Sequence, residues 1–292
     1  MPKLLVSGGT GLLGQGLLAL LAASGDYEVR CFVRPTSRVD RLGNVELAYG
    51  DAGDEESLSR ALRGVDAFVH VAGIEYTPQV LPAMRRAGVE RLVVVSSTSA
   101  HSAFEHRSGP RLSMEKLVRE SGLEWTIVRP SMIYGSELDH NMHKLLRFLN
   151  RSPVFPIFGP GENLWQPVYY EDLARGVLAA LEYPEAIGQS YDLPGAEPLA
   201  YVDLVSTAAR ALNKKPRIVH LPLEPVRRTL AAAERLGLPL PIKSEQVLRL
   251  REDKAYPYEK ARQKLGYTPR TFPEGIELEA ARLRELGMVG SR

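Results

Sequence analysis

Short apolar runs alternate with amphipathic segments through the first 130 residues. Residues 3–7 form an apolar run typical of a β-strand, and the helical periodicity of residues 12–23 stops at Gly25. The same alternation predicts strands at 28–33, 45–48, 67–71, 91–95 and 125–128, and helices at 54–62, 77–88 and 111–121. Because these strands are almost continuously apolar, we expect a parallel sheet covered by helices on both faces.

A glycine-rich turn lies between the first strand and the first helix, in the segment 8–14. Gly8 permits a tight turn, Gly11 lets the backbone approach a pyrophosphate, and Gly14 lets the helix pack closely on the strand. The helix N-terminus that follows favours negative charge. In this strand–turn–helix context the glycines predict a dinucleotide site.

The pattern becomes irregular after Pro130, where prolines and short elements replace the regular alternation. Helical periodicity returns at 203–212, 224–236 and 275–285. We therefore expect an α/β, Rossmann-type, doubly wound parallel sheet with a smaller C-terminal substrate-side region. Residues 1–130 would form the core of the dinucleotide-binding domain. Residues 131–292 would complete the sheet and form a smaller substrate-side subdomain.

The spacing of the glycines, GxxGxxG, resembles that of the short-chain dehydrogenase/reductase superfamily, especially its extended and atypical, NmrA-like branches. Later segments agree: Gly50-Asp51 resembles the family's adenine contact, Val71-Ala72-Gly73 its element after the fourth strand, and Arg129-Pro130-Ser131 its element near the nicotinamide. The segments 158–161, 166–168 and 171–174 resemble relatives of the NADH-dehydrogenase accessory subunit, which often bind NADPH without known turnover. The resemblance spans most of the chain.

The end of the second predicted strand indicates which dinucleotide is preferred. An NAD-selective site places an acidic residue there, on the ribose hydroxyl, but this chain has Arg34. Arg34, Ser37 and Arg38 offer guanidinium and hydroxyl groups suited to a 2′-phosphate, so NADP(H) is favoured over NAD(H). The expected cofactor-binding residues are Gly8, Thr10, Gly11, Leu12, Leu13, Gly14, Arg34, Ser37, Arg38, Asp51, Ala52, Val71, Ala72, Gly73, Ser96, Lys116 and Pro130.

The family's reductases and epimerases usually carry a YxxxK pair, whose tyrosine exchanges a proton with the substrate. Lys116 occupies the expected helix, but Leu112 stands four residues before it and can neither donate nor accept a proton. The resemblance assigns Thr98 to the substrate-orienting position. Lys116 would hold the nicotinamide ribose or act as the proton shuttle, and Tyr76 is the best substitute phenol.

Three other residues have simpler interpretations. His70 lies within a strand, where a satisfied core histidine is expected. Tyr134 is interpreted as a packing residue. His101, just beyond the fifth strand, is a weaker alternative base.

Composition and charge exclude several other functions. The 37 basic and 35 acidic side chains nearly cancel, without a basic block typical of nucleic-acid binding. The single cysteine, Cys31, excludes a disulfide framework and a thiolate metal site, and no metal is expected. No apolar run reaches the ~20 residues of a membrane span and no signal region precedes the first strand, so we expect a cytoplasmic protein. The short segment between the fourth and fifth strands favours a monomer.

Two functions remain open on the sequence. The first is an NADPH-dependent reductase of a small carbonyl, enone or quinone-like substrate, which the preserved Thr98 and Lys116 favour. The second is a non-catalytic cofactor-binding regulator or an assembly or accessory factor, which the missing tyrosine favours. A sugar-nucleotide epimerase or dehydratase is disfavoured, because that chemistry needs a base at the position of Leu112.

Overall fold

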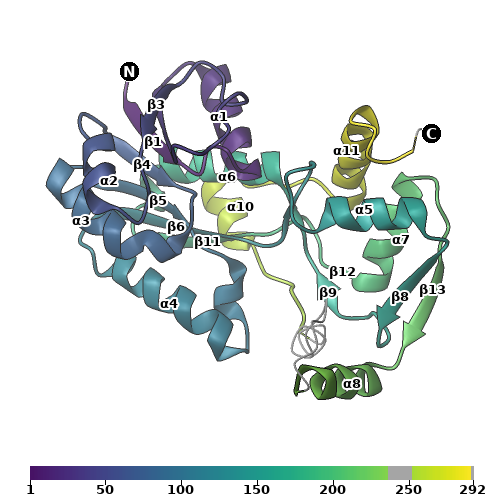
Figure 1. Cartoon of the computed structure of the whole chain (residues 1–292). Helices are drawn as coiled ribbons and strands as arrows, with labels where there is room; N and C mark the ends of the chain where they lie inside the picture. The colour runs from purple at the N-terminus through teal and green to yellow at the C-terminus, as the bar shows by residue number, and fades with distance from the viewer. Residues whose placement is uncertain (236–251, 291–292) are drawn as a thin grey trace. The chain divides into compact units, whose positions relative to one another are not determined.

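The computed structural model describes residues 1–235 and 252–290. A seven-stranded sheet has the order β11-β6-β5-β4-β1-β2-β3, and each neighbouring pair is parallel (Figure 1). The strands are β1 (Lys3–Ser7), β2 (Glu28–Val33), β3 (Glu46–Tyr49), β4 (Ala67–His70), β5 (Arg91–Val95), β6 (Glu124–Pro130) and β11 (Gln189–Leu193). The order reverses between β1 and β4, which is where doubly wound sheets bind their ligands. The expected α/β, Rossmann-type fold is confirmed.

Two separate apolar clusters cover the two faces of this sheet. Alternate residues of β1 divide between them, with Leu4 and Val6 in one cluster and Leu5 in the other. The first cluster includes residues of α1 (Leu12–Ser24), α6 (Tyr170–Glu182) and α10 (Glu259–Leu265); the second includes residues of α2 (Glu55–Ala61), α3 (Thr77–Ala87) and α4 (Glu105–Arg119). Burial on both faces explains why the strands are apolar throughout.

Helix boundaries agree with the sequence at several capping residues. The Asp54 carboxylate accepts a hydrogen bond from the backbone N–H of Glu56 at 3.0 Å and caps α2. Gly25 and Gly88 end α1 and α3 in the left-handed conformation, with φ of 69° and 72°. In contrast, α4 begins at Glu105, six residues before the predicted start, and continues through Pro110.

The chain forms two compact units, and each is built from three segments. The first unit comprises 1–133, 168–194 and 256–270, and the second comprises 134–167, 195–255 and 271–292. The segment expected to complete the sheet therefore supplies β11, α6 and α10 to the first unit. Also in the first unit are three short helices: η1 (Ile74–Tyr76), η2 (Thr98–His101) and η3 (Pro184–Ala186).

The second unit contains short strand pairs and helices. The strand β8 (Val154–Phe158) pairs with β13 (Arg217–Leu221), and β9 (Leu164–Trp165) pairs with β12 (Leu199–Ala200). A further short pair, β7 (Ile133–Tyr134) with β10 (Val168–Tyr169), does not belong to the second unit alone, because Ile133 and the whole of β10 lie in the first. The helices are α5 (Met142–Arg151), α7 (Tyr201–Ala211), α8 (Leu223–Arg235) and α11 (Phe272–Glu285).

The three helices predicted after residue 200 correspond to α7, α8 and α11, although residue 236 lies outside the described residues. The helices α5, α6 and α10 were not predicted. None of the helices in the described residues combines the length and the apolar character needed to cross a membrane.

Candidate active site

The glycine-rich turn is held against the loop that follows β4. Gly8 has a φ of 72°, and a Cβ atom added to it would lie 2.9 Å from the backbone nitrogen of Ala72. A Cβ atom on Gly14 would lie 2.2 Å from the carbonyl oxygen of Gly8. Both positions therefore need glycine, for the left-handed backbone at Gly8 and for the close approach of α1 at Gly14.

The N-terminus of α1 fits the diphosphate of a dinucleotide. Gly11 is its N-cap residue, with no side chain capping the helix and no acidic residue in the first turn. A Cβ atom on Gly11 would come no closer than 3.4 Å to its neighbours, so the turn itself does not require glycine there. The open backbone and the N–H groups of this turn suit an approaching anion.

The other predicted residues of the turn differ in exposure. Thr10 and Leu12 are half-buried, whereas Leu13 is only 4% exposed and belongs to the core. Leu13 can therefore offer a ligand its backbone N–H rather than its side chain. The sequence assigned no task to Gly9, yet a Cβ atom there would lie 2.4 Å from the Cys31 sulfur. Burial raises the pKa of this thiol to about 11, so Cys31 is a small neutral packing group.

His70 fastens the loop after β4 to the end of β1. Its Nε2 lies 2.8 Å from the carbonyl oxygen of Gly73, and its Nδ1 lies 2.8 Å from the hydroxyl of Ser7. A carbonyl only accepts, so Nε2–H donates to Gly73 and Nδ1 accepts from Ser7. Burial lowers the pKa of His70 to about 4, so the ring is neutral. The geometry agrees with a core histidine.

The segment that follows β2 carries two exposed arginines. Arg34 and Arg38 are exposed, and the backbone N–H of Ser37 donates to the carbonyl of Arg34 at 2.9 Å. Neither arginine forms an ion pair within the parts of the chain that the structure describes. Both guanidinium groups are therefore available for a bound anion.

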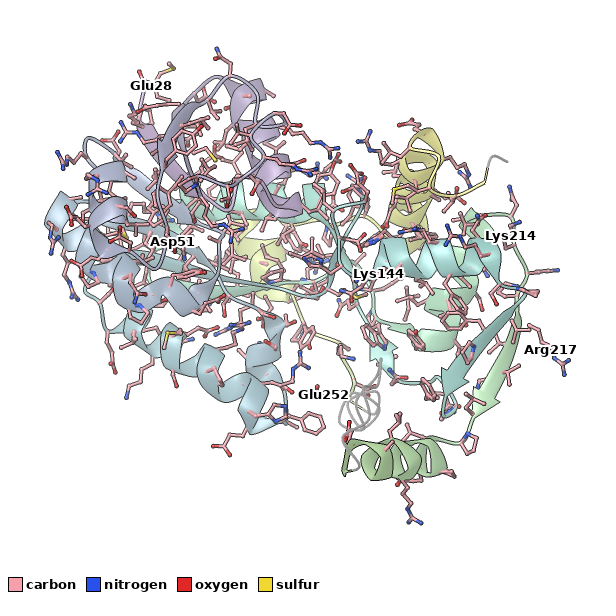
Figure 2. All side chains as sticks on the ribbon, in the orientation of Figure 1. Glu28, Asp51, Lys144, Lys214, Arg217 and Glu252 are labelled. Carbon is pink, nitrogen blue, oxygen red and sulfur yellow. The ribbon has the colours of Figure 1, made fainter. Side chains whose placement is uncertain are left out.

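The turn after β3 is built by Asp51, which Figure 2 labels. Its exposed carboxylate accepts from the backbone N–H of Gly53 at 2.8 Å, while Ala52 is buried. The ring of Tyr76 lies 3.8 Å from where a Cβ atom of Gly53 would be, and it also makes an edge contact with His70. Tyr76 is half-buried in this packing and joins the turn to the β4 loop.

A buried ionic network lies at the ends of β5 and β6, and sequence reasoning missed it. Glu115 on α4 is fully buried and accepts hydrogen bonds from Ser96 Oγ at 2.8 Å and from Arg129 Nε at 2.7 Å. Burial raises the pKa of Glu115, but the bonds from Arg129 outweigh that effect and hold it below its ordinary value. Arg129 also contacts Asp192 on β11, 3.4 Å away. The Ser96 hydroxyl therefore donates to Glu115, and its expected contact with a cofactor stays a prediction.

Lys116 lies on the expected helix, but its side chain faces solvent. Its side chain is 71% exposed and lies 3.8 Å from Glu120, and Leu112 is 44% exposed. Successive helix residues are separated by about 100°, so with Glu115 buried the next residue faces solvent. In this orientation of α4 the Lys116 side chain faces solvent, and its expected roles on the ribose and in proton transfer stay predictions.

The buried position that precedes Glu115 on α4 is Ser108, and the arginines Arg107 and Arg111 lie eight and four residues before Glu115. Both are half-buried, and Arg111 lies 3.4 Å from Glu75 in the loop after β4. Thr98 is 5% exposed at the start of η2, and Pro130 is buried at the end of β6.

Val71, Ala72 and Gly73 lie beside the glycine turn, so the structure brings these two predicted elements together. Over the described ranges, 1–235 and 252–290, no group of three or more His, Cys, Asp or Glu side chains could hold a metal ion.

Comparisons with known proteins agree with this geometry. Residues 8–145 match a family model described as NAD(P)H-binding. The chain is 26% identical over 271 residues to the mitochondrial NADH dehydrogenase [ubiquinone] 1 alpha subcomplex subunit 9 of Arabidopsis thaliana, covering 84% of this chain and 67% of that protein. It is 27% identical over 233 residues to a ceramide reductase of Caulobacter vibrioides, covering 74% and 73%.

The whole fold is shared with a solved nucleoside-diphosphate-sugar epimerase from Pseudomonas aeruginosa, at a TM-score of 0.80 and 23% identity over 99% of both chains. At that identity the likeness concerns the fold alone. Residues 8–145 thus match an NAD(P)H-binding family, and these relatives together support an atypical, epimerase-like member of the short-chain dehydrogenase/reductase superfamily.

Proposed function

We propose that the protein is an NADP(H)-dependent reductase of a small carbonyl, enone or quinone-like compound. The observation that carries this proposal is the pairing of an open glycine cradle with two exposed, unpaired arginines at the end of β2, Arg34 and Arg38. The cradle suits the diphosphate that NAD and NADP share. The arginines suit the one group that distinguishes NADP, its 2′-phosphate.

Charge explains the preference for the phosphorylated cofactor. An acidic residue at the end of β2 would accept hydrogen bonds from the ribose hydroxyls of NAD and repel a phosphate. The segment 34–38 contains two arginines and no acidic residue. A guanidinium donates two parallel hydrogen bonds to phosphate oxygens, and such charge-assisted bonds are about twice as strong as neutral ones.

The chain's own groups would bind and orient the two reactants. Backbone N–H groups at the start of α1 would hold the diphosphate, and the Thr98 hydroxyl would hold the substrate oxygen. Thr98 forms no side-chain hydrogen bond to another described residue, which supports that role. When bound, NADPH supplies the hydride. The ceramide reductase among the relatives supports this class of chemistry.

A second candidate function is a cofactor-binding accessory protein without turnover. Leu112 stands where the family's tyrosine is expected and cannot exchange a proton, and Lys116 faces solvent. The NADH dehydrogenase subunit among the relatives is named as a subunit of a larger assembly. In this reading the dinucleotide would stabilise the fold or be sensed.

Turnover measured with the full chain separates the two functions. NADPH oxidation, followed at 340 nm, should appear with at least one of four substrate classes: aldehydes, ketones, enones and quinones. It should be at least about tenfold faster with NADPH than with NADH at equal concentration, as expected for one lost phosphate contact. Tight calorimetric binding of NADPH without oxidation in any of the four classes would instead establish the accessory function.

A further inference from the structure

His101 and Asp192 form a close pair in the sheet-bearing unit. The Nε2 atom of His101, the last residue of η2, lies 2.9 Å from the Oδ1 atom of Asp192 on β11. The histidine side chain is 42% exposed, and the aspartate side chain is 18% exposed. The pair therefore joins a half-buried carboxylate to an imidazole that reaches solvent.

The pair lies at the carboxyl edge of the sheet, where doubly wound folds bind ligands. In the sheet register Asp192 is opposite Arg129, one residue from the end of β6. The backbone N–H of Ser96, just after β5, donates to Val128 at 2.7 Å, which places β5 and β6 in step. His101 follows three residues after Thr98 on the same short helix. It thus belongs to the same edge as the expected substrate-orienting hydroxyl.

Hydrogen bonding assigns the two ring nitrogens different tasks. The Asp192 carboxylate only accepts when ionised, so Nε2–H of His101 donates to it. The Nδ1 atom is then free to accept a proton, or to donate one when the ring is charged. The imidazole ring of His101 also lies beside the ring of Tyr256, with 5.8 Å between the two ring centroids. A carboxylate that orients one nitrogen while the other faces a reactant is the arrangement of an acid–base histidine.

Other charged groups around the pair set its electrostatics. Arg129 on β6 lies 3.4 Å from the Asp192 carboxylate. Lys260 on α10 donates to the carbonyl of Ser190 at 3.1 Å. Burial lowers the pKa of Lys260, and the charge of Arg129 acts in the same direction while Asp192 opposes it. The Asp192 carboxylate therefore contacts Arg129 and the imidazole, and it also interacts with Lys260 through its charge.

We propose that His101 is the acid–base residue of the carbonyl reduction and that Asp192 is its positioning residue; this rests on the proposed reductase function. As a hydride from NADPH forms the new C–H bond, the carbonyl π electrons move to the oxygen, which takes the proton from Nδ1 of the charged imidazole. The products are an alcohol, NADP⁺ and a neutral imidazole. The exposed ring then regains its proton from water.

Variants of full-length protein test the assignment. His101→Asn should lower turnover by about a hundredfold, a typical general-acid contribution, with the NADPH dissociation constant within about twofold of wild type. Asp192→Asn should lower turnover less and move the alkaline fall of activity to lower pH, because an amide stabilises the charged ring less than a carboxylate does. His106→Asn, at an exposed position on α4, is the matched control and should behave as wild type.

A second measurement does not depend on turnover. The ring resonances of His101 should shift when NADPH is replaced by NADP⁺, because the nicotinamide gains a positive charge, whereas those of His220 in the second unit should not. Unchanged His101 resonances would overturn the assignment of His101. This result can be obtained whether or not the protein turns over a substrate. Wild-type turnover in His101→Asn would overturn it while leaving the reductase function intact.

Discussion

The guanidinium of Arg129 holds the carboxylate of Glu115 through two hydrogen bonds, Nε to Oε1 at 2.7 Å and Nη2 to Oε2 at 2.6 Å. A planar guanidinium and a planar carboxylate in this arrangement fix each other's orientation. Because Glu115 is on a helix, the pair also fixes the rotation of α4 about its axis. This orientation determines which side chains of α4 face the sheet and which face solvent.

Lys116 follows Glu115 directly, so this orientation of α4 turns its side chain toward solvent. Lys116→Met should leave turnover and NADPH affinity within about twofold of wild type, because the removed charge is 71% exposed and pairs only loosely with Glu120. Steady-state kinetics and calorimetry check this. A loss of about a hundredfold would show that α4 rotates when ligands bind and would restore Lys116 as the proton shuttle.

The glycines of the turn should respond differently to alanine. Gly14→Ala should abolish the cooperative unfolding transition, because its methyl group would lie 2.2 Å from the Gly8 carbonyl oxygen. Gly11→Ala should melt like wild type but bind NADPH about tenfold more weakly, because its methyl group has room in the fold but obstructs the diphosphate. Thermal melting and calorimetry distinguish these outcomes. Unchanged affinity in Gly11→Ala would remove the diphosphate from this turn.

Arg34 should determine the choice between the two dinucleotides. Arg34→Ala should weaken NADPH binding by about tenfold or more and leave NADH binding unchanged, since only NADPH carries the 2′-phosphate. Arg86→Ala removes another exposed arginine, 2.7 Å from Glu55, and serves as the control. Equal calorimetric affinities of wild-type protein for NADPH and NADH would contradict the assignment.

His70 should make the fold sensitive to mild acid. Its folded pKa of about 4 lies below the ordinary 6.5, so the unfolded chain binds the proton first as pH falls. This contribution is complete above pH 6.5 and decreases as pH falls toward 4, by about 2 kcal/mol between pH 7 and pH 5. Urea unfolding of His70→Gln should show a shallower pH dependence, whereas His106→Gln should keep the wild-type one. Identical slopes in all three proteins would exclude His70 as the source.

Glu279 in the second unit should have the opposite effect. Burial and the neighbouring Asp139 raise its pKa to about 10. The Asp139 carboxylate accepts hydrogen bonds from the backbone N–H groups of Asn141 and Met142, at 2.8 and 2.7 Å. Stability is then greatest below the unfolded pKa of 4.5 and decreases as pH rises toward 10, by on the order of 1 kcal/mol per pH unit.

Replacing the acid by its neutral analogue tests this assignment. Glu279→Gln keeps the shape of the protonated side chain, so urea unfolding between pH 6 and 9 should lose most of its pH dependence. Glu277→Gln, at an exposed position on the same helix, should retain it. An unchanged pH dependence in Glu279→Gln would mean that the buried group is already ionised over this range.

The positions of the first six strands and the dinucleotide turn could be predicted because local patterns encode them. Each strand that is covered on both faces appears as an apolar run, and the turn needs glycine at Gly8 and Gly14 for reasons within a few residues. The face of α4 could not be predicted in the same way. A hydrophobicity pattern assigns Glu115 to the surface, and the arginine that permits its burial lies on another element, 14 residues later.

The start of α4 was missed for a related reason. Gly109 and Pro110 indicate a break, since proline cannot donate a backbone hydrogen bond and crowds the preceding turn. The structure continues the helix through both residues, and packing around Ser108 and Glu115 overrides the local preference. The pair formed by His101 and Asp192 was equally inaccessible, because 91 residues separate its members.

The three-segment construction of the sheet-bearing unit has a consequence for its synthesis. The glycine turn and six of the strands leave the ribosome first, but β11 and α6 follow only after the first excursion into the other unit, and α10 after the second. A Cβ atom on Gly16 would lie 2.9 Å from the ring of Tyr170, so α1 packs closely against α6, which is synthesised later. Part of the apolar face of the nascent first unit therefore stays uncovered until nearly the whole chain has been synthesised.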